Sequence, residues 1–67
     1  MASTYDPKAL LNDLIAELTL SILSLELQID ISLKENPAVI PILERVAAAH
    51  ISTRDATILA LNHLEVL

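Results

Sequence analysis

The sequence predicts an all-α protein: one long two-faced amphipathic helix followed by a short two-helix hairpin, assembling as an oligomeric helical bundle. The first observation is a run of apolar residues between positions 11 and 29 at alternating spacings of four and three, the period of a helical seam packed against a neighbour. The second is a hydrophobic fraction of 54%, reached without any glycine in 67 residues. One small core cannot hide that much apolar surface, so we expect more than one copy to share it.

Two opposite sides of the long helix are apolar. The seam on one side consists of Leu11, Ile15, Leu18, Ile22, Leu25 and Ile29. At 100° per residue, Leu20, Leu23 and Leu27 fall on the other side. Since an uncovered side would be a large exposed apolar patch, both sides need a cover. We expect the seam to be the oligomer interface, covered by a second copy, and the rest of the chain to fold back over Leu20, Leu23 and Leu27.

A second interpretation of this stretch is a β-strand. Between Leu18 and Leu33 apolar residues partly alternate with polar ones, which is the period of a half-buried strand. A single strand of that length would extend ~50 Å, several times the usual length, and no turn signal divides it into a hairpin. Length therefore favours the helix.

The long helix is expected over residues 7–34. The Asp6 carboxylate can accept from the free N–H groups of the first turn, and Pro7 at the first helical position loses no hydrogen bond. Lys34 lies near the negative end of the helix dipole. The helix should then break at Glu-Asn-Pro, residues 35–37, because the residue before a proline is pushed out of the helical region.

A second helix is expected over residues 41–49. In one regular helix, the ring of Pro41 would clash with the carbonyl of Pro37, so a turn or a kinked first turn should separate the two prolines. Three successive alanines near the end of this helix would allow close approach of a neighbour.

The third helix is expected over residues 53–66. Ser52, followed three residues later by Asp55, is a weak form of the capping box that starts helices. Only His50 and Ile51 would then separate the last two helices, which predicts a tight helical corner. The three helices together form a single domain over residues 1–67.

Charge and composition limit the partners. Four basic residues against nine acidic ones give a net charge of −5, which repels nucleic acid and anionic membrane surfaces. Glu17, Glu26 and Asp30 interrupt the long apolar stretch, so we do not expect it to span a membrane. No basic region precedes an apolar core as in a secretory signal. We therefore expect a cytoplasmic protein without membrane contacts, and the charge disfavours nucleic acid as a partner.

Candidate catalytic and metal-binding residues are few. His50 and His63 are the only side chains whose ordinary pKa lies near neutrality, and neither has further ligands at the helical spacings of a metal site. Ser21, Ser24 and Ser32 lie on polar helix positions and not at a nucleophile elbow. We expect no enzymatic activity, no metal and no cofactor, and we leave open whether the histidines act beyond structure.

Residues 46–65 resemble the helix-turn-helix of winged-helix regulators: a small-residue helix, a short turn and a Ser-Thr pair opening a second helix. This resemblance implies DNA binding. However, Ile58 and Leu61 stand where a recognition helix presents polar groups to base edges. Our leading hypothesis is therefore a protein-protein interaction or regulatory module that forms a homo-oligomer, most simply a dimer, and that could also bind another protein. A DNA-binding regulator is the alternative.

Overall fold

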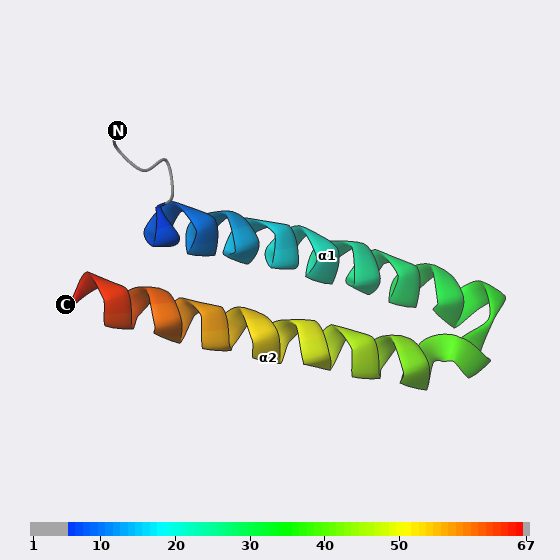
Figure 1. The fold of residues 1–67 in the computed structure, drawn as a ribbon. Helices are drawn as coiled ribbons and strands as arrows, with labels where there is room; N and C mark the ends of the chain where they lie inside the picture. Colours follow the sequence, from blue (N-terminus) through cyan, green and yellow to red (C-terminus); the bar gives the residue numbers. More distant parts are fainter. Residues whose placement is uncertain (1–5, 67) are drawn as a thin grey trace.

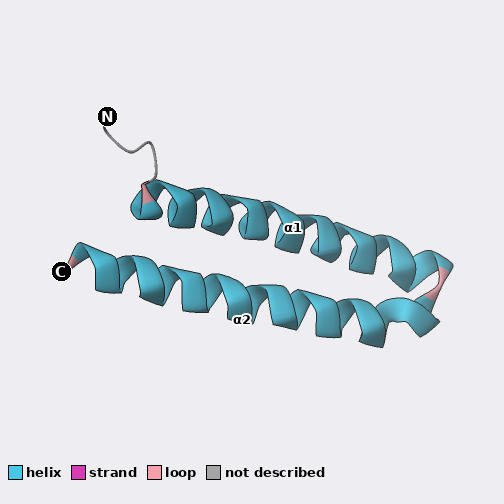
Figure 2. Cartoon of the chain, in the orientation of Figure 1, coloured by secondary structure: helices cyan, strands magenta, loops and turns pink. Residues whose placement is uncertain are grey.

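The computed structural model describes residues 6–66 as two long antiparallel helices joined by a tight turn (Figure 1). Helix α1 spans Pro7–Glu35 and helix α2 spans Ile40–Glu65. The short 3-10 helix η1, Pro37–Val39, connects them. The described part of the chain contains no strand (Figure 2), so the all-α prediction is confirmed and the strand interpretation is wrong.

The start of α1 follows from its first residues. The backbone of Asp6 is extended. Its side-chain carboxylate accepts hydrogen bonds from the N–H groups of Lys8, at 3.0 Å, and Ala9, at 3.3 Å. Pro7 occupies the first helical position, where no N–H is needed. The predicted N-terminal cap is therefore confirmed.

The turn between the helices follows from its two prolines. Asn36 leaves the helical conformation, with φ −154° and ψ 76°, and its N–H donates to the carbonyl of Ser32 at 2.9 Å. Pro37 opens η1, and Pro41 lies in the first turn of α2, where its missing N–H breaks no hydrogen bond. The predicted break and turn are confirmed, and α1 ends one residue later than expected.

Helix α2 is one continuous helix where the sequence predicted two, at 41–49 and 53–66. His50 and Ile51, the expected corner, lie inside it with helical geometry. The prediction of a separate two-helix hairpin after the long helix is therefore wrong. The hairpin of this protein is formed by α1 and α2 themselves.

Local hydrogen bonds show how α2 continues through the expected corner. The Thr53 hydroxyl donates to the carbonyl of Ala49 at 2.9 Å, and the Thr57 hydroxyl donates to the carbonyl of Thr53 at 2.7 Å. Serine and threonine make such bonds to the preceding turn when they lie inside a helix. With no glycine or proline after Pro41, the capping signal at Ser52 is too weak to end a helix in which good helix formers, Leu43 to Arg45 and three alanines, precede it.

The two helices pack along one row of residues each. On α1 the row is Leu11, Ile15, Leu18, Ile22, Leu25 and Ile29, and on α2 it is Ile40, Leu43, Ala47, His50, Arg54, Thr57, Leu61 and Leu64. All of these residues are partly or fully buried, and both rows have spacings of three and four, as in coiled coils. Ile22, Ala47 and Leu61 are the buried apolar residues of the described chain, so the core is thin.

Helix α2 covers the side of α1 that we assigned to a second copy. Ile22 in the seam is 4% exposed, whereas Leu20, Leu23 and Leu27 are between 55% and 67% exposed. The expectation that the rest of the chain folds over Leu20, Leu23 and Leu27 is therefore wrong. The physical reason is the matching period of the two rows: a continuous α2 offers a seam of its own along nearly the whole length of α1.

Candidate interaction surface

Large apolar side chains are exposed over most of the hairpin. Those at least 37% exposed are Leu10, Leu14, Leu20, Leu23, Leu27, Ile31, Leu33, Ile42, Val46, Ile51, Ile58, Leu59 and Val66. Only three apolar residues of the described chain are buried. A hairpin of two helices has a single helix-helix contact, so it can cover only one side of each helix.

The six residues predicted as the oligomer interface are brought together by the fold. Ile22 is buried, and the other five are half-buried on the side of α1 that faces α2. The structure thus gives the seam an intramolecular neighbour. A contact of the same six residues with a second copy stays a prediction.

One broad face of the hairpin is formed by residues that directly precede those of the packed rows, and it includes the carboxylate of Glu17, which precedes Leu18 and lies seven residues after Leu10. Its residues on α1 include Leu10, Leu14, Glu17, Ser21 and Gln28, and its residues on α2 include Ile42, Val46, Ala49, Thr53, Ala56 and Ala60. Each of these residues directly precedes a residue of one of the packed rows. Because both helices are right-handed and run antiparallel, these positions fall on the same side of the two-helix layer.

The opposite broad face is acidic. It contains the residues that directly follow the packed rows and their neighbours, among them Glu26, Asp30, Glu44, Asp55 and Glu65. Lys8 and Lys34 lie near its two ends on α1. Both broad faces of the hairpin therefore carry carboxylates, and both expose apolar side chains.

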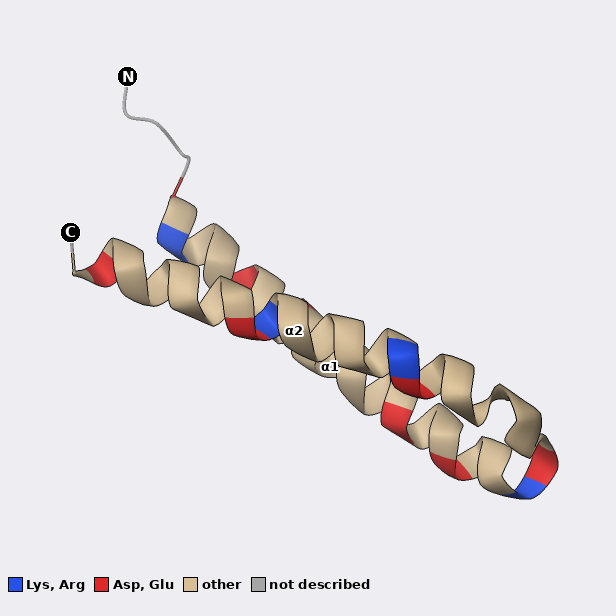
Figure 3. Cartoon of the chain, turned by 90° about the horizontal axis from the view of Figure 1, so that it is seen from below, with Lys and Arg blue, Asp and Glu red and all other residues tan. Residues whose placement is uncertain are grey.

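Basic residues do not gather anywhere on the described chain. Figure 3 shows the Lys and Arg positions singly and well apart along the hairpin, among more numerous Asp and Glu positions. The helix-turn-helix expected in residues 46–65 does not form, because this segment is part of one continuous helix. The structural feature that implied DNA binding is therefore absent.

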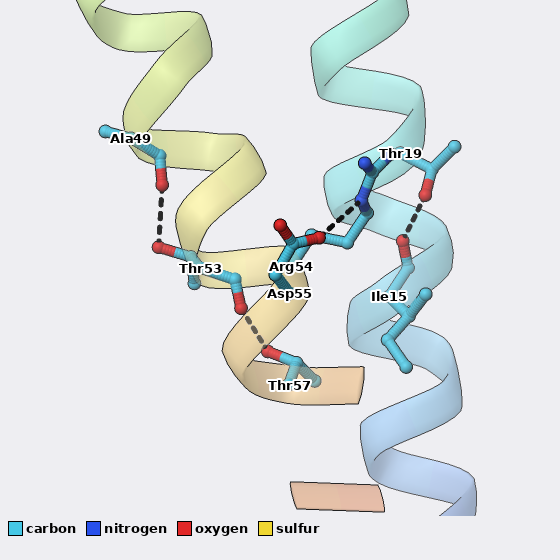
Figure 4. Close-up of polar contacts among 7 residues, drawn as sticks. All are labelled: Ile15, Thr19, Ala49, Thr53, Arg54, Asp55 and Thr57. Atoms are coloured by element: carbon cyan, nitrogen blue, oxygen red, sulfur yellow. Dashed lines mark hydrogen bonds and ion pairs between the residues drawn. The ribbon is translucent and has the colours of Figure 1, made fainter. Parts of the chain in front are cut away.

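Arg54 is the one charged residue in the packed row of α2. Figure 4 shows its side chain extending from α2 toward α1, in the region of Thr19. Its Nε is shielded from solvent and donates no hydrogen bond, and the nearest carboxylate oxygen, Oδ1 of Asp55, is 3.8 Å away. This position was not among the residues predicted to be packed, although residue 54 continues the spacing of three and four along α2.

We expect Arg54→Leu to stabilise the protein. A shielded polar atom without a hydrogen-bond partner costs about 1–3 kcal/mol, and leucine would fill this partly buried position, where the arginine side chain is 29% exposed, with apolar contacts instead. Urea denaturation should therefore show a free energy of unfolding about 1 kcal/mol higher or more. Arg45→Leu, at an exposed position of the same helix, is the control and should change it by less than about 0.5 kcal/mol. A less stable Arg54→Leu variant would show that the guanidinium makes a favourable contact.

The two histidines do not come together. Nδ1 of His50 donates to the carbonyl of Val46 at 2.8 Å, within α2. His63 is exposed about 20 Å further along the same helix. Among residues 6–66, no three His, Asp or Glu side chains are grouped closely enough to hold a metal ion.

A hollow near the turn end of α1 is also not a site of convergent chemistry. It is lined by Asp30, Ile31, Lys34 and Glu35, all from the last turns of α1 itself. A ligand site usually collects polar groups from several elements in an enclosed cavity. This hollow is an open groove between neighbouring side chains of one helix.

Comparisons with protein-family models, with curated proteins and with solved structures find no match for the chain. Neither described helix combines the length and the apolarity needed to cross a membrane. The fold and its surface therefore define the class: an antiparallel two-helix hairpin with apolar side chains exposed on several sides.

Proposed function

We propose that the protein is a small homo-oligomeric module for protein-protein interaction, with a dimer as its basic unit. The observation that carries this proposal is the excess of exposed over buried large apolar side chains on the described helices. Monomeric proteins rarely expose contiguous apolar patches larger than a few hundred Å². A second copy would cover part of this surface and complete the thin core.

The size of the chain supports the same proposal. Below about 70–80 residues a single core rarely supplies enough stability, and natural proteins of this size add disulfides, metal or oligomerisation. With no cysteine in the sequence, disulfides are excluded. A shared core between copies is a direct way for two helices of 29 and 26 residues to become stable.

Thermal unfolding tests this proposal. When a dimer dissociates as it unfolds, mass action raises the midpoint temperature with protein concentration. We expect the midpoint, followed by far-UV circular dichroism, to rise steadily over roughly a hundredfold range of concentration. A cooperative transition with the same midpoint at every concentration would contradict the proposal.

A further inference from the structure

We infer that the second copy docks on the outer edge of α1, so that two α1 helices pack antiparallel around a two-fold axis. This inference rests on the proposed homo-oligomer and names the surface that it uses. The outer edge is the side of α1 turned away from α2. Its large apolar residues are Leu20, Leu23, Leu27 and Ile31, and we call them the outer stripe.

The outer stripe lies opposite the packed seam of α1. At 100° per residue, Leu20 and Leu27 point about 160° and 140° away from Ile22, which lies in the middle of the contact with α2. Leu20 is 67% exposed, Leu27 is 59% exposed and Leu23 is 55% exposed. Nowhere else on the two described helices do three large apolar side chains at spacings of three and four each stand more than half exposed. The stripe is therefore the most strongly exposed apolar row that the hairpin leaves uncovered.

The stripe ends in charges of opposite sign. Asp13 lies seven residues before Leu20, and Lys34 lies seven residues after Leu27; both charged side chains are exposed. Residues seven apart fall on nearly the same side of a helix. The outer edge therefore runs from a carboxylate to an ammonium group over about 32 Å of helix.

Two-fold symmetry turns this order into charge complementarity. In an antiparallel pair centred between residues 23 and 24, Leu20 of one copy lies across from Leu27 of the other, and Asp13 lies across from Lys34. Each of these contacts occurs twice. A parallel pair would instead set Asp13 against Asp13 and Lys34 against Lys34, and like charges at an interface are costly. Charge therefore favours a second copy as the occupant and selects the antiparallel orientation.

Two further carboxylates border the stripe without opposing each other. Glu17 and Asp30 lie on opposite sides of it around the helix. In the antiparallel pair Glu17 lies across from Ile31 of the other copy, and Asp30 lies across from Ala16. Within this pairing no carboxylate lies directly across from another carboxylate.

The other exposed sides of the hairpin lack this complementarity. The acidic face would bring Glu44 and Asp55 of one copy toward the carboxylates of the other. The broad face that contains Glu17 has no lysine or arginine among its described residues. The outer edge of α2 carries Arg45 at one end, but its other end, at Val66, offers no acidic partner in the described chain.

Leu20→Glu and Leu59→Glu form a matched pair for the test. The two leucines are 67% and 69% exposed, and each lies on the outer edge of its helix, Leu20 on α1 and Leu59 on α2. Sedimentation velocity should show that Leu20→Glu weakens dimer affinity by roughly a hundredfold, since an unpaired charge becomes buried in each copy. Leu59→Glu should remain within about threefold of the unsubstituted protein.

A charge exchange tests the antiparallel pairing. Asp13→Lys and Lys34→Asp should each weaken the dimer by roughly tenfold, because two attractive pairs become repulsive. The double variant forms both pairs in the reverse sense and should return to within about threefold of the unsubstituted protein. Asp13→Lys also makes the chain less acidic, so general repulsion alone would predict a tighter dimer. Arg45→Asp on the outer edge of α2 is the control for Lys34→Asp, with the same change of charge and an expected effect within about threefold.

Each result bears on a different part of the account. A wild-type monomer would overturn the proposed homo-oligomer itself. A wild-type dimer that tolerates Leu20→Glu as well as Leu59→Glu would overturn the outer stripe as the interface and leave the homo-oligomer standing. A double charge variant as weak as the single ones would contradict the antiparallel pairing. If Leu20→Glu loses helical signal, the charge exchange decides, because Asp13 and Lys34 are both exposed in the hairpin.

Discussion

Ile22→Asp is expected to unfold the hairpin at neutral pH. Ile22 is the most buried side chain of the described core, at 4% exposure, and lies in the middle of the contact between α1 and α2. Removing its apolar side chain costs about 2–5 kcal/mol, and a buried unpaired carboxylate adds to that loss. This sum is comparable to the whole stability of so small a chain. Far-UV circular dichroism should show most of the helical signal lost.

Ser24→Asp is the control for that substitution. It introduces the same carboxylate two residues away, at an exposed position on the other side of α1. We expect the free energy of unfolding to change by less than about 0.5 kcal/mol. Equal stability of the two variants would contradict the packing of the seam against α2.

Ser52→Pro should have the second large effect, because it tests whether α2 is continuous. Proline in a helix interior removes a hydrogen bond and clashes with the preceding turn, at a cost of about 3 kcal/mol or more. Ser52 is exposed, so no packing is lost with its side chain. Denaturant unfolding should show a destabilisation of about that size or an unfolded chain.

Ser52→Ala separates this backbone effect from the loss of the hydroxyl. Alanine is the better helix former, so we expect stability to be unchanged or slightly raised. If α2 were instead two helices meeting near residue 51, Ser52→Pro would be tolerated and Ser52→Ala would remove a cap and destabilise the protein. That pattern would restore the three-helix arrangement.

The elements that depend on local chemistry could be predicted from the sequence. The cap of Asp6 with Pro7 and the break before Pro37 lie where the sequence places them, because a carboxylate acceptor and a proline ring act within a few residues of themselves. The apolar seam of α1 was equally visible, since all its positions are Leu or Ile. Its burial follows from that regularity.

The continuity of α2 was harder to predict because polar residues hide its packed row. His50, Arg54 and Thr57 occupy three successive positions of that row, so it does not stand out as an apolar seam. A weak capping signal at Ser52 then suggested a break that tertiary packing overrides. Without a continuous α2, the side of α1 that is covered within the chain could not be identified.

The broad faces of the hairpin could not be recognised before the helices were paired. Leu10 and Leu14 lie on α1, and Ile42, Val46 and Ala49 lie on α2. Only the antiparallel pairing sets these residues on one face of the molecule.

Sedimentation equilibrium of the unsubstituted protein tests the central claim, self-association of the hairpin, most directly. At micromolar concentration and near-physiological salt, we predict a mass of twice the 7.3 kDa chain, or a higher even multiple of it. The helical signal should be retained in the same sample. A folded, helical species with the mass of one chain, unchanged over the accessible concentrations, would contradict the account.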